Sequence, residues 1–243
     1  EFGRQIKFGA YSDYGMHAEL LRDLLLFWSA KEQKMITLAE YAKGMPEDQK
    51  AIYYAAGDSR ERLAKMPVVK GVLDRGYDVL LLTQDVDEFT FQAMREYVAA
   101  DMPKIYEDDA AREAAEKAVA DGAEPEVEDR HLELKNVATG DLDLATEDEK
   151  KEAEDATKEN EDLFSAMKEA LGDKVEKVAV SARLTDAPAC ITTEGPLSLE
   201  MEKVLNQQAA VNGGQSVHAE RVLELNAEHP IFKKLCALQA EGS

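Results

Sequence analysis

Residues 51–97, AIYYAAGDSRERLAKMPVVKGVLDRGYDVLLLTQDVDEFTFQAMREY, contain the clearest pattern of secondary structure in the sequence. Two short apolar runs, Ala51–Ala55 and Val79–Leu82, flank a segment with helical spacing, which predicts the order strand, helix, strand, helix. The second run is apolar at consecutive positions, which is typical of a parallel strand buried on both faces. Parallel strands joined by a helix form a right-handed crossover unit. The sequence therefore predicts an α/β domain with helices covering its sheet.

The two helices of this stretch carry start signals where the strands end. Asp58 stands three residues before Glu61, and Asp85 stands three before Glu88, and both pairs resemble the N-terminal capping box. Gly57, at the end of the first strand, is placed where an α/β fold can receive a phosphate on a helix N-terminus. The neighbouring carboxylates would repel such a ligand, and a turn glycine is the alternative interpretation.

Composition limits the classes of function. The chain has 243 residues, 44% of them hydrophobic, and a net charge of -21, which opposes binding to nucleic acid or to an anionic membrane. Residues 107–162 contain 22 acidic and 7 basic side chains and therefore carry most of this charge. No apolar run approaches the roughly 20 residues that span a bilayer. Cys190 and Cys236 indicate two buried thiols in a reducing, cytoplasmic compartment and no disulfide framework.

The region before the central stretch is expected to be helical. Residues 15–33 have apolar side chains around most of a helical circumference, which favours one helix packed on more than one face. Thr37–Glu40 is a capping box for a short second helix that ends at Gly44. Residues 102–130 are rich in alanine and glutamate and poor in large apolar groups, so we expect a solvated, partly helical excursion. The strand His131–Thr139 should follow it.

A second domain is expected after a charged linker at about residues 140–150. A long helix should bury only its end, around Leu163 and Phe164, before two strands at Val175–Ser181 and Pro188–Thr193 that we expect to form a hairpin. An amphipathic helix, Leu197–Ala210, is followed by a predicted strand and a final helix. Helices on a small mixed sheet make this an α+β domain.

Searches for catalytic chemistry find no pattern that nominates a residue. The four histidines lack the spacing of a metal site, and GxxxxGK, GxGxxG and GxSxG are all missing from the sequence. With 50 acidic residues, carboxylate pairs are too common to indicate a general acid or base. We therefore expect no catalytic residue, no metal ligand and no cofactor-binding residue in this chain.

Six separated segments resemble, in order, the heat shock protein 90 chaperone family, and most closely its bacterial branch. They are FGRQIKFGAYSDYG, LLRDLLLFWSAKE, TLAEYAKGMPEDQKAIYYAAGDS, DVLLLTQDVDEF, VEKVAVSARLTDAPACI and ELNAEHPI. The resemblance covers almost the whole chain except about 102–130, which looks like an acidic insertion. It implies part of an ATP-driven homodimeric chaperone that remodels unfolded or partly folded client proteins.

The resemblance also implies a domain assignment. Residues 1–50 look like the helical connector of the family's middle domain, 51–140 like its small three-layer α/β half, and 141–243 like a C-terminal domain without its last dimerisation helices. The nucleotide-binding domain, with its ATP and magnesium, is expected outside this chain, which should be no enzyme by itself. Without the terminal helices we expect a monomer. Expected partners are clients, other domains of the same chaperone and co-operating chaperones, with no nucleic acid and no membrane.

The resemblance implies two client-contact regions, one that matches Glu88, Phe89 and Gln92 and a second that matches Met201 and Leu205. Bacterial relatives commonly have tryptophan where this chain has Phe89, and Leu205 stands where a second methionine is expected. Ordinary packing is the alternative for Phe89, Met201 and Leu205, because apolar residues at helical spacing usually face a core. The competing hypothesis for the whole chain is an independent α/β ligand-binding or regulatory protein that uses the strand ends near Gly57.

Overall fold

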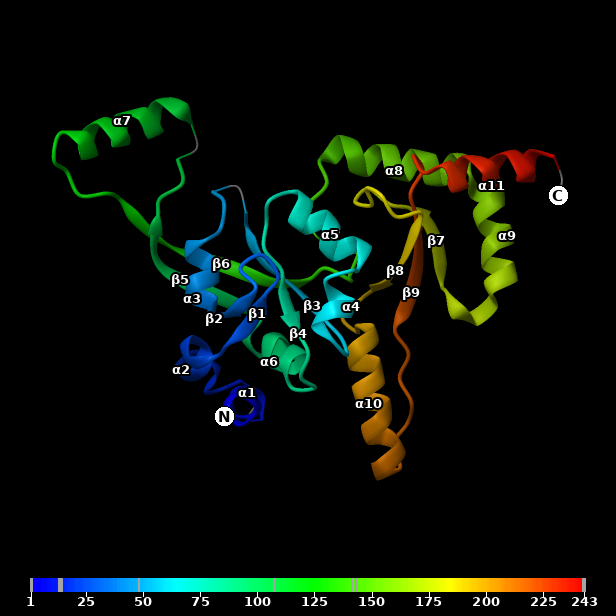
Figure 1. The fold of residues 1–243 in the computed structure, drawn as a ribbon, viewed down its shortest axis with the longest axis horizontal. Coiled ribbons are helices and arrows are strands. Elements are labelled where there is room, and N and C mark those ends of the chain that lie inside the picture. The colour runs from blue at the N-terminus through cyan, green and yellow to red at the C-terminus, as the bar shows by residue number, and fades with distance from the viewer. Residues whose placement is uncertain are drawn as a thin grey trace.

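The computed structural model describes residues 2–12, 15–47, 49–106, 108–140, 142 and 144–241. Within these residues the chain forms a six-stranded sheet and a three-stranded sheet, each covered by helices. Figure 1 shows the larger sheet between its helices on the left and the smaller sheet on the right, with the last helix at the far right. The expected combination of an α/β unit with an α+β unit is confirmed.

The larger sheet has the order β2-β1-β4-β3-β6-β5. Its strands are β1 (Phe27–Ser29), β2 (Lys34–Ile36), β3 (Ala51–Ala56), β4 (Leu80–Leu82), β5 (Glu96–Pro103) and β6 (Val127–Asn136). Strand β3 pairs in parallel with both β4 and β6, while β1 and β5 run antiparallel to their neighbours. The predicted parallel crossover from β3 to β4 is therefore confirmed.

Helices cover both faces of this sheet. One face carries α1 (Gly3–Tyr11), α3 (Leu38–Lys43) and α6 (Asp87–Met94), and the other carries α4 (Arg60–Leu63) and α5 (Pro67–Asp74). Side chains of β3 alternate between these layers: Ile52 and Tyr54 pack in the cluster that contains Phe91 of α6, whereas Tyr53 packs in the cluster that contains Val69 of α5. The side-chain and backbone bonds of a capping box join Thr37 and Glu40, as expected.

The single helix expected over residues 15–33 is wrong. The chain forms a short helix α2 (Ala18–Leu21), a 3-10 turn η1 (Arg22–Leu24) and then strand β1. Leu25 and Phe27 are buried while Leu26 between them is exposed, which is the two-residue period of a strand. A short apolar run is compatible with the period of a helix and with that of a strand. Here the pairing of β1 with β2 and β4 stabilises the strand. Residues 1–50 are therefore only partly helical.

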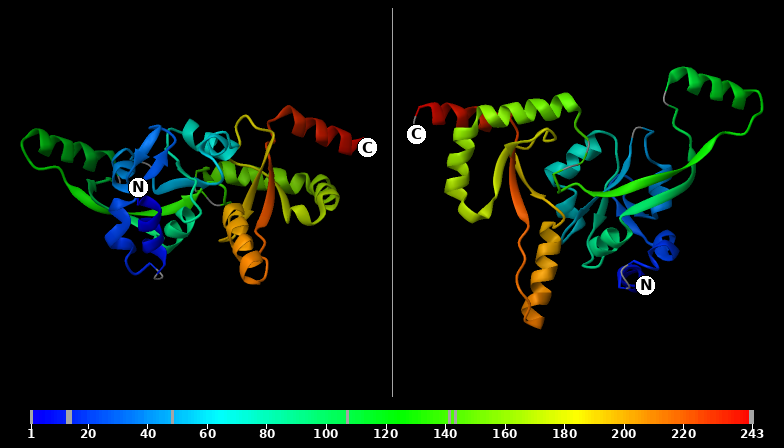
Figure 2. Two further views of the ribbon diagram at one scale, coloured as in Figure 1. Left: turned by 60° about the horizontal axis from the view of Figure 1, so that its bottom comes forward. Right: turned by 180° about the vertical axis from the view of Figure 1, so that it is seen from behind.

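Strands β5 and β6 extend beyond the sheet as an arm that carries helix α7 (Asp109–Ala120) at its end. This confirms a partly helical excursion, although two features were missed. Tyr97 was expected in a helix and lies in β5, and the returning strand begins at Val127, four residues earlier than expected. Figure 2 shows the arm standing away from the rest of the molecule in both views.

The smaller sheet has the order β7-β9-β8, so the expected hairpin is wrong. Its elements are α8 (Glu147–Glu159), α9 (Glu161–Leu171), η2 (Gly172–Lys174), β7 (Lys177–Val180), β8 (Ala189–Glu194), α10 (Leu199–Asn212), β9 (Glu220–Leu225) and α11 (Pro230–Ala240). Strand β9 lies between the other two, parallel to β7 and antiparallel to β8. The last strand in sequence is thus the central strand, and the sheet is mixed as expected.

The core of this unit confirms one expectation and corrects another. Leu163 and Phe164 are buried together with Phe232 of α11, as the apolar end of the long helix predicted. That helix is broken at Asn160 into α8 and α9, because the Asn160 side chain donates to the carbonyl oxygen of Ala156 and its backbone leaves the helical conformation.

Candidate functional site

The first candidate site is the contact between α6 of the larger unit and the start of α10, here called the α6–α10 junction. Glu88 of α6 is only 4% exposed. One carboxylate oxygen accepts a hydrogen bond from Ser198 Oγ (2.6 Å), and the other accepts from Asn136 Nδ2 (2.7 Å). The Tyr54 hydroxyl also hydrogen-bonds this carboxylate. Ser198 in turn caps α10 by accepting from the backbone N–H of Met201.

Further polar contacts cross the same junction one turn along each helix. The Nε2 group of Gln92 donates to the carbonyl oxygen of Pro196 (3.1 Å) and lies 2.8 Å from Sδ of Met201, which is buried. Lys203 of α10 forms an ion pair with Asp58, which follows β3. Three of the five proposed contact residues, Glu88, Gln92 and Met201, therefore meet at one point.

The other two proposed contact residues lie beside this point. Phe89 turns toward α1, where its ring centroid is 5.8 Å from that of Tyr11, and Tyr11 packs edge-on against Phe8 at 5.3 Å. Phe89 is half-buried, and Phe8 is 53% exposed. Leu205, one turn beyond Met201 on α10, is also half-buried. Phe8, Tyr11 and Phe89 form what we call the aromatic strip.

The start of α6 is held in place by a buried ion pair and not by the expected capping box. Asp87 accepts hydrogen bonds from the backbone N–H groups of Thr83 and Gln84, and its other oxygen lies 2.7 Å from Nζ of Lys7 on α1. Asp85 pairs instead with Arg4. The Glu88 carboxylate binds Ser198 and Asn136 in the junction. The expected Asp85–Glu88 capping box is therefore wrong, because both side chains bind partners outside the helix.

Burial raises the pKa of the Glu88 carboxyl above its usual range, and the nearby charge of Glu200 acts in the same direction. The hydrogen bonds from Ser198, Asn136 and Tyr54 favour the ionised form and oppose this shift without cancelling it. Burial, together with the Glu88 charge, also raises the pKa of Tyr54, which remains a donor. A cleft of about 400 Å³ opens beside these groups, between Phe91, Arg95 and Pro196.

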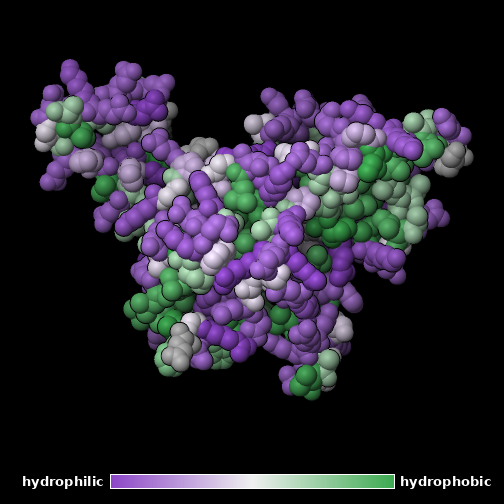
Figure 3. Space-filling model, viewed as in Figure 1, coloured by the Kyte–Doolittle hydropathy of each residue, from purple (hydrophilic) through white to green (hydrophobic). Residues whose placement is uncertain are grey.

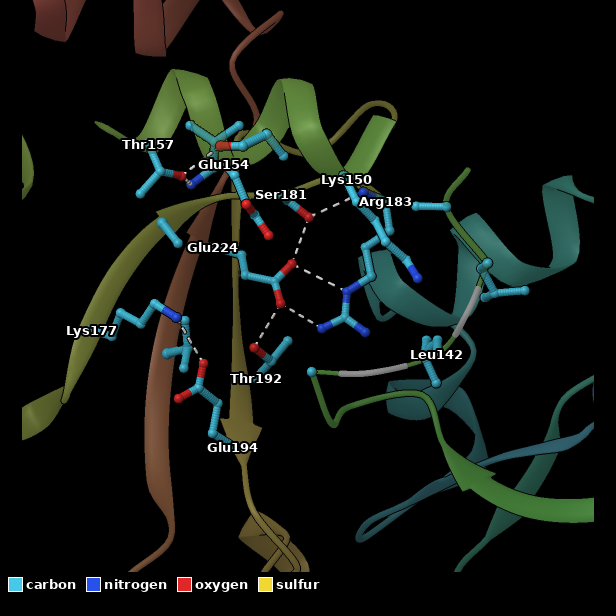
Figure 4. Close-up of a pocket in the computed structure, with 18 of the residues that line it drawn as sticks. Leu142, Lys150, Glu154, Thr157, Lys177, Ser181, Arg183, Thr192, Glu194 and Glu224 are labelled. Atoms are coloured by element: carbon cyan, nitrogen blue, oxygen red, sulfur yellow. Dashed lines mark hydrogen bonds and ion pairs between the residues drawn. The ribbon is translucent and has the colours of Figure 1, made fainter. Parts of the chain in front are cut away.

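A second contact between the two units is built on Arg183 (Figure 4). Its guanidinium donates to both oxygens of Glu224 on β9 and to the backbone carbonyl oxygens of Val137 and Thr139, which leave β6. Thr192 donates to Glu224 from the neighbouring strand. Burial works to raise the pKa of Glu224, but the hydrogen bonds and charge of Arg183 outweigh it, and the net pKa is lowered.

Beside Arg183 lies a cavity of about 460 Å³ between α8, the segment after β6 and the smaller sheet. Its basic side chains are matched by acidic ones: Lys177, for example, lies 2.9 Å from Glu194. Cys190 packs close by, and burial, with the Glu224 charge, raises the pKa of its thiol to about 12. Both cysteines are free thiols.

The strand end at Gly57 is already engaged. The backbone N–H of Gly57 donates to the Leu82 carbonyl oxygen (3.0 Å), and Asp58 pairs with Lys203. The helix after it is capped by Ser59, not by Asp58. In the described part of the chain, no group of three or more His, Cys, Asp or Glu side chains could hold a metal ion. No helix there is both long and apolar enough to cross a membrane.

Sequence reasoning missed the residues that complete the two contacts, Ser198, Asn136 and Arg183. Ser198 had a usable signal, because a serine directly before an amphipathic helix is a typical N-cap. Asn136 and Arg183 had none, since their partners are 48 and 41 residues away in sequence. Tyr11 and Phe8 of the aromatic strip were likewise not identified as neighbours of Phe89.

Comparison with known proteins identifies the family of this sequence. The model of the family described as Hsp90 protein matches residues 1–130 and 125–243. Proteins named chaperone protein HtpG are 43% identical in Clostridium botulinum (strain Langeland) and 42% identical in Bacillus velezensis and Clostridium perfringens, each over 234 residues. These alignments cover 96% of this chain and 32% of each relative, so the chain spans about a third of the length of the curated relatives it matches. The chain belongs to the Hsp90 protein family.

Proposed function

We propose that this chain is a part of an ATP-dependent chaperone that contributes a surface for unfolded or partly folded client proteins. The observation that carries the proposal is the aromatic strip, which lies beside the α6–α10 junction and its cleft. Exposed aromatic and flexible apolar side chains suit the recognition of many different unfolded chains. The relatives named chaperone protein HtpG support the chaperone class.

The five proposed contact residues have different roles in this proposal. Phe89, Gln92 and Leu205 can contact a client while the junction is closed, because each keeps some exposed surface. Glu88 of α6 and Met201 of α10 are buried where the two helices meet. They become available to a client only if α10 moves away from α6. Client binding by these two residues therefore requires an open junction.

Other exposed apolar residues extend the proposed surface along α1, α2 and η1. Phe2, Met16, Leu20 and Leu24 are each more than half exposed. Figure 3 shows hydrophobic surface gathered at the lower left of the view, where α1 and α2 lie in Figure 1. Either a client or another part of the same longer polypeptide can cover this surface. We propose that nucleotide and magnesium act outside this chain, which alone turns over no ATP, in a cytoplasmic protein.

The test measures binding of a permanently unfolded protein, reduced and carboxymethylated α-lactalbumin, by fluorescence anisotropy. We expect Phe89→Ser to weaken binding severalfold, because the substitution removes the ring of the aromatic strip that lies on α6. Val127→Ser is the matched control, since Val127 is a 54% exposed apolar residue on the distant arm. Equal affinities for the two variants, with unchanged circular dichroism, would exclude the proposed surface. Detectable ATP binding by calorimetry would favour the alternative of an independent ligand-binding protein.

A further inference from the structure

The cleft beside the α6–α10 junction lies where the parallel strands β3 and β6 end. Tyr54 and Asn136 pair in register in these strands, and both line the cleft, which has a volume of about 400 Å³. The chain leaves β3 toward α4 on one face of the sheet, and it leaves β4 toward α6 on the other face. Open α/β sheets bind ligands outside the carboxyl ends of their strands, where such connections diverge. Position and size therefore mark the cleft as a candidate ligand site.

Arg95, directly after α6, lines this cleft and has a strained backbone. Its φ of 62° and ψ of -48° lie outside the regions that residues other than glycine favour. The conformation is held from both sides, because the Arg95 N–H donates to the Phe91 carbonyl oxygen and the Arg95 carbonyl oxygen accepts from the Leu134 N–H. Glycine is the usual residue at such a helix end and adopts a positive φ without this cost. An arginine kept under strain indicates a use for its side chain.

The Arg95 guanidinium is available to a ligand. It is exposed, and within the described residues it forms no hydrogen bond and no ion pair. Lys135, the second cation of the cleft, lies 3.3 Å from Glu133. Glu88 is the carboxylate of the lining, and both of its oxygens already accept hydrogen bonds. A cationic ligand would meet two like charges here, whereas a carboxylate can accept two parallel hydrogen bonds from the guanidinium.

The surroundings of Arg95 limit the ligand to a single negative charge. A phosphate ester carries about -1.5 to -2 charges at pH 7, and its second charge would lie near the Glu88 carboxylate. The net charge of -21 opposes any polyanion. Apolar surface is supplied by half-buried Leu134 and by Pro196. We infer that the cleft binds a carboxylate attached to a small apolar group, with Arg95 as the counter-ion. The carboxylate belongs either to a small organic acid or to an acidic side chain of a polypeptide.

The test titrates the whole chain with hydrocinnamate, a carboxylate with a phenyl group, and follows calorimetry and amide NMR. We expect saturable binding that weakens with salt and shifts the amides of Arg95, Leu134 and Gly195. Phenylpropylamine has the same ring and the opposite charge, and it should bind at least tenfold more weakly. A capped peptide with glutamate between two leucines distinguishes the sources. Binding of hydrocinnamate alone assigns a small organic acid, and binding of the peptide alone at the same amides assigns an acidic side chain.

Two substitutions at Arg95 separate its charge from its backbone strain. Arg95→Gln removes the guanidinium and should weaken binding of the carboxylate probe about tenfold or more. Arg112→Gln is the matched control, because it removes the same charge from α7 on the arm and should leave affinity unchanged. Arg95→Gly relieves the positive φ, so this variant should unfold at a higher urea concentration than the native chain while binding as weakly as Arg95→Gln.

Four results would overturn the carboxylate site. They are no binding of either carboxylate probe, equal or tighter binding of phenylpropylamine, unchanged affinity of Arg95→Gln, and amide shifts confined to residues outside the cleft. The site is independent of the proposed client surface, because Phe89 turns toward Tyr11. Phe89→Ser should therefore weaken binding of the unfolded protein and leave hydrocinnamate binding unchanged, so that failure of one proposal is distinguished from failure of the other.

Discussion

Replacing Glu88 should change how firmly the two units are held together, because its carboxylate accepts hydrogen bonds from three donors across the α6–α10 junction. Glu88→Ala leaves Ser198, Asn136 and Tyr54 without this acceptor. Hydrogen bonds to a charged group contribute about 1.5–3 kcal/mol each, but the buried carboxylate costs several kcal/mol of desolvation. Water from the adjoining cleft can replace part of the lost bonding. We expect a net loss of about 2–4 kcal/mol at neutral pH.

Glu88→Gln separates charge from hydrogen bonding. The amide oxygen can still accept from Asn136, and the amide N–H₂ can donate to Ser198, so the loss should stay below about 1 kcal/mol. The folded-state pKa of Glu88 is raised, so the folded protein binds more protons than the unfolded chain between the two pKa values. The contribution of Glu88 is therefore fully present below the unfolded pKa of about 4.3 and is lost as pH rises through the folded pKa.

The assay is urea unfolding at several values between about pH 5 and pH 8, with small-angle scattering to follow separation of the units. Subtracting the Glu88→Gln curve from the native curve isolates Glu88 from carboxylates with lowered pKa values, such as Glu224, whose contribution is lost as pH falls. We expect the native protein to gain stability relative to Glu88→Gln as the solution is acidified. An identical pH dependence of the two proteins, or an unchanged stability of Glu88→Ala, would show that the Glu88 carboxylate does not hold the two units together.

Three further predictions follow from other contacts. Arg183→Ala leaves Glu224 buried without its cation and should cost about 3–5 kcal/mol in urea unfolding, whereas a loss below about 1 kcal/mol would contradict the contact. A Cβ at Gly71 would lie 2.9 Å from the Arg183 carbonyl oxygen, so Gly71→Ala should lower the free energy of unfolding by about 1–3 kcal/mol. Gly3→Ala is the control, because a Cβ there meets open space and should leave stability unchanged. Equal effects of the two substitutions would argue against the close approach at Gly71. Because burial raises its pKa to about 12, the Cys190 thiol should react with iodoacetamide much more slowly at mildly alkaline pH in the native chain than after unfolding, and equal rates would show that it is accessible.

The sequence was most informative where local pattern and tertiary environment agree. The parallel pair β3 and β4, the capping box at Thr37 and the buried end of α9 were all predicted, because hydrophobic period and end signals coincide there. Prediction failed where distant pairing decides the outcome. Strand β1 is held by β2 and β4, and β9 pairs along its length with both β7 and β8, with Glu224 of β9 accepting hydrogen bonds from Arg183 and Thr192.

At the candidate site, too, the residues could be identified from the sequence but their contacts could not. The resemblance implied two separate client-contact regions, one with Glu88 and Gln92 and one with Met201, and the structure brings these three residues together at the α6–α10 junction. The burial of Glu88 and Met201 was not predictable, because it depends on contact between α6 and α10, whose residues are more than a hundred positions apart. Phe89 turns toward Tyr11 because α1 lies against α6, held by the Lys7–Asp87 ion pair, and no local pattern encodes that contact.

Residue-resolved mapping of an unfolded client on this chain tests the proposed client surface directly. Reduced and carboxymethylated α-lactalbumin would be titrated into the isotope-labelled chain and followed by amide and methyl NMR. We expect the largest changes at Phe89, Gln92 and Leu205, with Glu88 and Met201 affected only when the junction opens, and smaller changes in the arm. Perturbations confined to residues outside α1, α6 and α10, or binding that leaves these helices unchanged, would contradict the proposed client surface.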